Sequence, residues 1–150
     1  MSDARIRSAQ AADIVSLARL RALWRGEAVT PEFVERFRAW YEREQPSRWC
    51  WIADNETDGA VGMVNLKLFE RMPSPSSPPS RWGYLANLFV RPEHRGRGIG
   101  DALVTALVDR SIAENLVRIV LAPSEQALPL YGRHGFGPAD ELVLRRLRAD

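Results

Sequence analysis

The chain has 150 residues, of which 45% are hydrophobic and 27% charged, proportions typical of a globular protein. This length allows one sizeable hydrophobic core, so we expect a single domain over residues 1–150. The formal net charge is only +2, and acidic and basic residues are interleaved, which argues against a nucleic-acid-binding surface.

Cysteine and histidine are scarce in the sequence. The chain has one cysteine, Cys50, and two histidines, so we expect no intrachain disulfide and no cluster of metal ligands. Cys50 lies in an apolar run and is expected to be a small core residue rather than a nucleophile. No apolar run approaches the roughly 20 residues of a membrane span, and no signal-peptide pattern is present. We therefore expect no membrane association and a location in the reducing cytoplasm.

The chain begins with a short strand and two helices. Residues 4–7 alternate in polarity and predict an edge strand. An apolar stripe over residues 11–24 predicts a helix that ends at Gly26. Thr30 and Pro31 then form a start signal for a second helix, because a capping hydroxyl precedes a proline at the first helical position.

Strands are expected after the second helix, which extends to about Glu44. Residues 49–53 and 60–69 predict a hairpin joined by a turn at residues 54–59. Residues 71–80 contain four prolines and four serines, a composition that favours a mobile loop over a ladder or a helix.

The second half of the chain alternates strands with helices. We expect strands at residues 84–90, 118–121 and 141–147, and helices at residues 98–114 and 125–134. Strands joined through a helix must pair in parallel, so the strands at residues 84–90 and 118–121 form such a pair. The pattern predicts a mixed α/β fold with a largely antiparallel central sheet, one parallel strand pair and about four flanking helices.

A loop of glycines and arginines, residues 95–100 (Arg-Gly-Arg-Gly-Ile-Gly), lies where the strand at residues 84–90 leads into a helix. The first amides of a helix lack intrahelical partners and lie at the positive end of its dipole. The glycines leave this backbone bare, so the loop predicts a phosphate or pyrophosphate site. The dinucleotide fingerprint fails because Asp101 replaces its last glycine, and the P-loop fails because Lys67 is the chain's only lysine.

The pattern Arg95-x-x-Gly98-x-Gly100 after an apolar strand resembles the acetyl-CoA-binding motif of the GNAT superfamily of acyl-CoA-dependent N-acyltransferases. Residues 130–136 (Leu-Tyr-Gly-Arg-His-Gly-Phe) resemble the late Tyr-x-x-x-Gly-Phe segment of the same family. This resemblance, which spans roughly residues 84–136, implies a sheet whose parallel strands splay apart so that the pantetheine arm of acetyl-CoA enters the gap.

The resemblance implies acetyl-CoA as cosubstrate. Backbone groups of residues 88–90 would bind the pantetheine in the manner of an added strand, and the amides of residues 95–100 would bind the pyrophosphate. Ser124 stands where many family members carry an asparagine, and it can donate one hydrogen bond with less reach. The residues expected to contact acetyl-CoA are Leu88, Phe89, Val90, Arg95, Gly96, Arg97, Gly98, Ile99, Gly100, Ser124 and Tyr131.

Tyr131 resembles the family's tyrosine that hydrogen-bonds the coenzyme sulfur. The pKa of a phenol, near 10, exceeds that of a thiol, about 8.5, so complete proton transfer to the thiolate is uphill by roughly 2 kcal/mol. We therefore expect hydrogen-bond stabilisation of the leaving thiolate first. The strand at residues 84–90 lacks the carboxylate that many family members carry, which leaves the general base open. Asn87 and Tyr84 are candidates for positioning a water, and Glu32 or Glu35 for approaching from the second helix.

The acceptor pocket is expected between the first two helices and the loop at residues 71–80, with substrate contacts from Trp24, Phe33, Phe37 and Trp82. His94 is expected at the surface, and His134 is expected to be structural.

The sequence thus predicts an N-acetyltransferase that acts on a primary amine of a small molecule by direct attack in a ternary complex, as a monomer or homodimer. Two alternatives stay open: acetylation of a peptide or protein amine, and a non-catalytic acyl-CoA-binding or sensor domain. The missing strand carboxylate favours the non-catalytic alternative, and Tyr131 argues against it.

Overall fold

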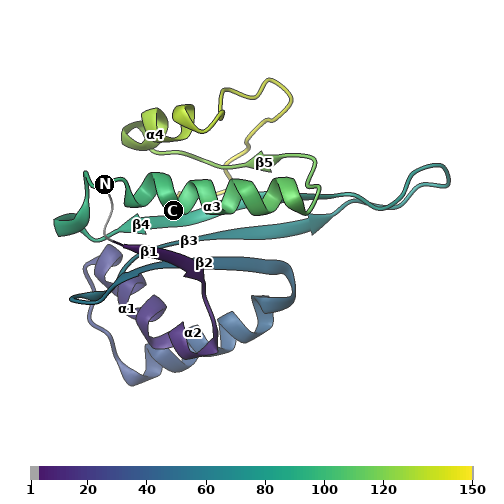
Figure 1. The fold of residues 1–150 in the computed structure, drawn as a ribbon. Helices are drawn as coiled ribbons and strands as arrows, with labels where there is room; N and C mark the ends of the chain where they lie inside the picture. The colour runs from purple at the N-terminus through teal and green to yellow at the C-terminus, as the bar shows by residue number, and fades with distance from the viewer. Residues whose placement is uncertain (1–3, 150) are drawn as a thin grey trace.

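The computed structural model describes residues 4–149 and shows a five-stranded sheet between two helical layers (Figure 1). The strands lie in the order β1-β2-β3-β4-β5, and every neighbouring pair is antiparallel except β4 and β5. The mixed sheet with one parallel pair is therefore confirmed. The strands are β1 (Arg5–Ser8), β2 (Arg48–Asn55), β3 (Gly59–Glu70), β4 (Arg81–Val90) and β5 (Ile119–Val120).

Helices α1 and α2 cover one face of the sheet, and α3 and α4 lie on the other side (Figure 1). The helices are α1 (Ile14–Arg25), α2 (Pro31–Glu44), α3 (Ile99–Ala113) and α4 (Leu128–Arg133). Within residues 4–149, no helix combines the length and the apolar character needed to cross a membrane.

Each face of the sheet has its own apolar core. On the α3 side, Ile99, Leu103 and Leu107 repeat at helical spacing and are at most 1% exposed. On the α1 side, Ile14 and Leu17 pack with Phe89 of β4. Burial of each such side chain contributes about 1.5–3 kcal/mol, so the helical stripes hold the layers together.

Local signals at two helix ends are confirmed. The Thr30 hydroxyl accepts a hydrogen bond from the Phe33 amide at 3.1 Å, and Pro31 occupies the first helical position of α2. Gly26 ends α1 in the left-handed conformation, with φ of +68°.

Strand β4 carries a bulge at Asn87, where φ is +58°. Its neighbours Ala86 and Phe89 pair with Asn65 and Met63, so Val64 of β3 alone faces two residues of β4. An extra residue in one strand bends that strand and changes the direction of its side chains. The bulge therefore divides β4 into two segments with different side-chain directions.

The contact between β4 and β5 is short. The two strands pair only through Gly83 with Ile119 and Tyr84 with Val120. Within the described chain, no strand pairs with residues 85–90 on this side. The predicted splay is present, and the backbone of the second half of β4 is open to another partner.

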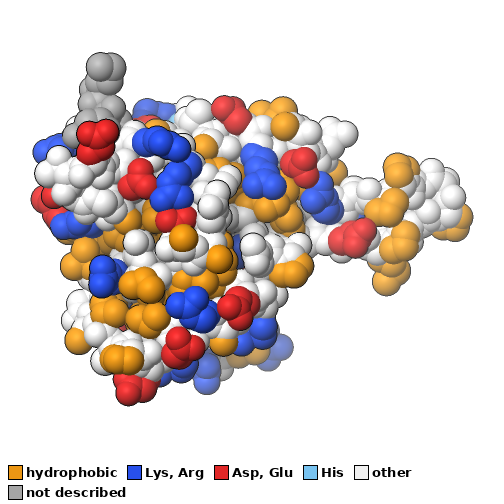
Figure 2. All heavy atoms as spheres, turned by 60° about the horizontal axis from the view of Figure 1, so that its bottom comes forward, with side chains coloured by type: hydrophobic (Ala, Val, Ile, Leu, Met, Phe, Trp, Pro, Cys, Tyr) orange, Lys and Arg blue, Asp and Glu red, His pale blue; other side chains and the backbone are white. Residues whose placement is uncertain are grey.

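The predicted strand at residues 141–147 does not form, and these residues are irregular in the structure. Val143 is 99% exposed and Leu147 is 83% exposed, so the apolar pattern finds no buried face. β5 is only two residues long and offers too short an edge for another strand to extend. Residues 71–80 form a long connection that projects from the sheet, with one isolated bridge between Ser74 and Ser77 (Figures 1 and 2).

An ion pair joins β1 to the start of α1. The Arg7 guanidinium donates to both carboxylate oxygens of Asp13 at 2.8 Å, and Asp54 of β2 accepts from Arg7 Nε at 3.0 Å. Asp13 also accepts the backbone amide of Gln10 at 2.8 Å. The hydrogen bond from Arg7 is the main cause that lowers the pKa of the buried Asp13 carboxyl.

We predict that Asp13→Asn lowers the free energy of unfolding by about 2 kcal/mol at pH 7, because Arg7 loses the more buried of its two carboxylate partners and keeps only Asp54. The pKa of Asp13 is lowered from 3.8 by folding, so this stability is present above 3.8 and is lost as pH falls through the lower folded-state value. Urea unfolding of both proteins at neutral and strongly acidic pH measures the difference. If Asp13→Asn lowers the free energy of unfolding equally at the two pH values, the loss comes from packing and not from charge.

Candidate active site

The loop between β4 and α3 turns through two glycines in the left-handed region, Gly96 with φ of +77° and Gly98 with φ of +80°. Gly98 immediately precedes α3 and supplies no side-chain cap to it. A Cβ at either glycine would meet no heavy atom within 4 Å, so both positions border open space. The backbone just before the first turn of α3 therefore borders a free volume, and the start of a long helix favours an anion.

Helix α4 packs directly on the first turn of α3 (Figure 1). A Cβ at Gly100 would lie 3.0 Å from the Leu130 side chain, which explains a glycine here without any positive φ. Asp101 accepts hydrogen bonds from Arg133 Nε at 3.2 Å and Nη2 at 3.0 Å, and His134 Nε2 lies 2.9 Å from it. The bond from Arg133 is the main cause that lowers the pKa of Asp101. The acid nearest the helix start is thus neutralised by α4 and does not cap α3.

The two arginines of the loop differ in their surroundings. Arg95 Nε donates to the Val90 carbonyl at 3.0 Å, and its guanidinium lies 5.8 Å from the Phe89 ring centroid. Arg97 is exposed and makes no ion pair within residues 4–149. Arg95 therefore covers the end of β4, and Arg97 is available to a ligand.

His94 lies in the interior, and the expectation of a surface histidine is wrong. The residue is 3% exposed, with Nε2 at 3.0 Å from the carboxylate of Asp58 in the β2–β3 turn. The short turn Pro92–His94 directs the ring inward although charged residues flank it in the sequence. His94 thus anchors the start of the glycine loop to the neighbouring hairpin.

Tyr131 of α4 is 7% exposed and packs edge-on against Phe136, with ring centroids 5.7 Å apart. Burial raises the pKa of this phenol, which keeps it protonated at neutral pH. No hydrogen bond to the described residues engages its hydroxyl, so the group is free to donate to a ligand. Ser124, by contrast, is exposed in the connection between β5 and α4.

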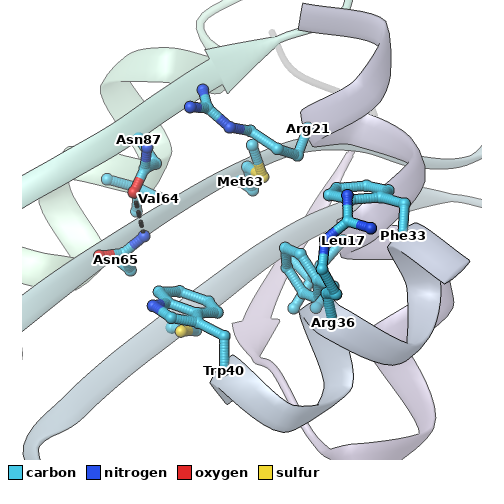
Figure 3. Close-up of a pocket in the computed structure, with 11 residues that line it drawn as sticks. Leu17, Arg21, Phe33, Arg36, Trp40, Met63, Val64, Asn65 and Asn87 are labelled. Atoms are coloured by element: carbon cyan, nitrogen blue, oxygen red, sulfur yellow. Dashed lines mark hydrogen bonds between the residues drawn. The ribbon is translucent and has the colours of Figure 1, made fainter. Parts of the chain in front are cut away.

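A cavity of about 340 Å³ lies on the α1 and α2 side of the sheet (Figure 3). Its volume is within the range of small-molecule sites. The residues that line it are Leu17, Arg21, Phe33, Arg36, Phe37, Trp40, Cys50, Met63, Val64, Asn65 and Asn87. Burial raises the pKa of the Cys50 thiol to about 11, so this thiol stays protonated and is a weak nucleophile.

Of the predicted acceptor contacts, Phe33 and Phe37 line this cavity. Trp24 does not line it but stacks on Phe89, with ring centroids 5.5 Å apart. Trp82 stacks on Phe69 at 4.5 Å, at the base of the projecting connection, and is not among the lining residues. The structure therefore brings together two of the four aromatic residues.

A series of contacts between polar side chains links α2 and strands β2, β3 and β4, and ends at the cavity. Lys67 Nζ contacts Glu44 at 3.0 Å, Glu44 contacts Arg48 at 2.8 Å, and Arg48 donates to Asn65 Oδ1. Asn65 Nδ2 then donates to Asn87 Oδ1 at 2.9 Å (Figure 3). Because its oxygen is already engaged, Asn87 presents its NH₂ group as a donor.

The other candidate groups for proton transfer lie outside the cavity lining. Glu35 is paired with Arg38 at 3.5 Å, Glu32 is exposed, and Tyr84 is half-buried on β4. None of the described lining residues is Asp or Glu.

Sequence reasoning missed Arg21, Arg36, Arg48 and Asn65. Two signals were available: Asn65 is an amide within an apolar strand, and Arg21 follows Leu17 by four residues on the apolar stripe of α1.

Residues 14–136 match the sequence profile of the acetyltransferase (GNAT) family. This match covers most of the chain, which therefore belongs to that family. The resemblance seen in the two motifs is confirmed.

Similar proteins agree with this assignment. The chain is 28% identical over 119 residues to the uncharacterized N-acetyltransferase YobR of Bacillus subtilis (strain 168), a match that covers 77% of this chain and 43% of YobR. It is 35% identical over 54 residues to a glucosamine 6-phosphate N-acetyltransferase of Trypanosoma brucei brucei, which covers 36% of this chain and 37% of that protein. The chain thus spans less than half the length of these curated relatives.

A solved structure supports the fold. The crystal structure of a predicted acetyltransferase with acetyl-CoA from Clostridium acetobutylicum has a TM-score of 0.73 and 22% identity, with 96% of each chain covered.

We predict that Gly98→Ala weakens acetyl-CoA binding by about tenfold or more, because an alanine is strained at positive φ by about 1–2 kcal/mol and its methyl group enters the space before the helix amides. Gly26→Ala is the matched control, since Gly26 also has a positive φ and open surroundings but ends a different helix. Calorimetric titration with acetyl-CoA and thermal unfolding of both variants separate binding from stability. If the two variants bind acetyl-CoA with equal affinity, the loop does not contribute to acetyl-CoA binding.

Proposed function

We propose that the protein transfers an acetyl group from acetyl-CoA to the primary amine of a small molecule by direct attack within a ternary complex. The observation that carries this proposal is the open half of β4. Its unpaired edge leads into the glycine loop at one end, and its bulge directs Asn87 into a cavity of small-molecule size. A site for a long cosubstrate and a pocket for an acceptor therefore meet on one strand.

The residues present fit acetyl-CoA. The first amides of α3, with Gly96 and Gly98 beside open space, would hold the pyrophosphate, and Arg97 is free to add a positive charge. Backbone groups of residues 88–90 would hold the pantetheine, although the Val90 carbonyl already accepts from Arg95. When bound, the thioester supplies the activated acetyl group.

In the reaction, the amine nitrogen forms a bond to the acetyl carbon as the carbon–sulfur bond breaks, and the amine loses a proton. The role of Tyr131 is to donate a hydrogen bond to the developing thiolate, and its raised pKa keeps the phenol in the donor form. Asn87 offers an NH₂ donor, so it orients a water or the acyl oxygen and does not take the proton. We assign the proton to water, held near Asn87 and Tyr84.

The cavity volume of about 340 Å³ favours a small acceptor over a peptide, because it is near the lower end of the range for small-molecule sites. The Trypanosoma relative named for glucosamine 6-phosphate supports the same class. We further propose a single domain that acts as a monomer or homodimer in the cytoplasm.

The lack of a carboxylate in the described lining favours one other function, a non-catalytic acyl-CoA sensor. A thiol-release assay with acetyl-CoA and a panel of amines and peptides separates these functions. Turnover of small amines supports the transferase, and tight acetyl-CoA binding without turnover of any amine supports the sensor.

We predict that Tyr131→Phe lowers kcat by about tenfold or more and leaves acetyl-CoA affinity nearly unchanged, because only the donor to the leaving sulfur is removed. Tyr41→Phe is the control, since the Tyr41 hydroxyl donates to the Ala9 carbonyl at 3.4 Å, away from the lining of the cavity. Steady-state kinetics and acetyl-CoA titration of both variants provide the measurement. An unchanged kcat in Tyr131→Phe would exclude Tyr131 from the chemistry.

A further inference from the structure

The acceptor cavity contains two arginines, Arg21 from α1 and Arg36 from α2. The Arg21 guanidinium lies 5.0 Å from the Trp24 ring centroid, and that of Arg36 lies 5.8 Å from the Phe33 ring centroid. Each guanidinium thus lies over an aromatic ring, a contact that does not consume its N–H donors.

Neither guanidinium has a carboxylate partner. Within residues 4–149, no ion pair or side-chain hydrogen bond engages Arg21 or Arg36. Ion pairs engage Arg7, Arg25, Arg38, Arg48, Arg81, Arg91 and Arg133, whereas other arginines, such as Arg97 and Arg110, have none within residues 4–149. The described cavity lining includes no Asp or Glu. The cavity is therefore lined by two cations, the half-buried Arg21 and the exposed Arg36, and by no described acid.

The remaining polar groups of the lining are amides. Asn65 and Asn87 lie on the β3 and β4 side of the cavity, and Arg36 lies on α2 beside Phe33 (Figure 3). Arg21 extends from α1 over the sheet (Figure 3). A bare ammonium ion entering this space would meet two cations and no counterion. An oxyanion on the same molecule would satisfy the free guanidinium donors, which suit carboxylate and phosphate geometry.

We propose that the acceptor is an anionic amine, a small molecule that carries a carboxylate or phosphate group bound by Arg21 and Arg36. Its apolar body lies against Phe37 and Trp40. This inference rests on the proposed acetyl transfer, since it names the class of acceptor.

The test uses pairs of amines that differ in one anionic group: glucosamine with glucosamine 6-phosphate, and phenylalaninol with phenylalanine. For the wild-type protein, kcat/KM of the anionic member should exceed that of the neutral member by at least about tenfold. The pair that shows the preference identifies the anion as phosphate or carboxylate. Arg21→Gln and Arg36→Gln should each reduce the preference by about tenfold, with acetyl-CoA affinity unchanged.

Arg38→Gln is the matched control. Arg38 lies on the same helix as Arg36 but is paired with Glu35 at 3.5 Å and is outside the lining, so this variant should keep the wild-type preference. Circular dichroism confirms that each variant is folded. Equal kcat/KM within both pairs, or a preference that survives in the Arg21→Gln/Arg36→Gln double variant, would overturn the inference and leave the acetyl transfer intact.

If the protein binds acetyl-CoA but acetylates no amine, the proposed acetyl transfer is wrong. The anion site is then tested by the binding of anions to the protein. Inorganic phosphate and acetate should then raise the melting temperature of the wild-type protein more than that of the double variant. Because phosphate also suits the start of α3, only the part of the shift that depends on Arg21 and Arg36 counts. An identical shift in the two proteins would overturn the anion site.

Discussion

Strand β4 has two environments along its length. Through Gly83 and Tyr84 it pairs with β5, and beyond Tyr84 its edge has no strand partner in the described chain. The backbone amides and carbonyls on this edge have no strand partner within residues 4–149. Burying them without hydrogen bonds would be costly, so this edge favours a ligand or water that pairs with them. The bulge at Asn87 falls within this open half and directs one side chain to the opposite face of the sheet. The candidate active site depends on this combination of an open edge and a bulge.

The glycine loop before α3 and Tyr131 of α4, both assigned to acetyl-CoA, are joined by contacts between the two helices. Asp101, at the start of α3, contacts Arg133 and His134 at the end of α4, and Gly100 allows Leu130 to approach closely. Tyr131 lies on the same short helix. A change in the packing of α4 would therefore move the phenol and the helix amides together, which couples cosubstrate binding to the position of the proposed donor.

On the α1 and α2 side of the sheet, some polar side chains have hydrogen-bond or ion-pair partners and others have none among the described residues. Arg48 is engaged by Glu44 and Asn65, and this chain of contacts holds Asn87 in one orientation. Arg21 and Arg36 border the same cavity without such partners. The first group positions a side chain, whereas the second leaves binding capacity for a ligand.

The sequence by itself determined most of the strands and helices in their order, the two motifs at residues 95–100 and 130–136 that indicated the family, and the caps at Gly26 and Thr30, because these depend on contacts within a few residues. The final strand at residues 141–147 was predicted wrongly, since a strand needs a neighbouring edge as well as an apolar pattern.

Only the tertiary structure decided the bulge at Asn87, the burial of His94 and the place of Trp82 away from the acceptor cavity. The same holds for the two unpaired arginines: Arg21 and Arg36 lie 15 positions apart in the numbering of the chain, and nothing local indicates that α1 and α2 bring them to one cavity without an acid. Local sequence sets hydrogen bonds along a helix or turn, but the charge and shape of a cavity depend on which distant segments pack together.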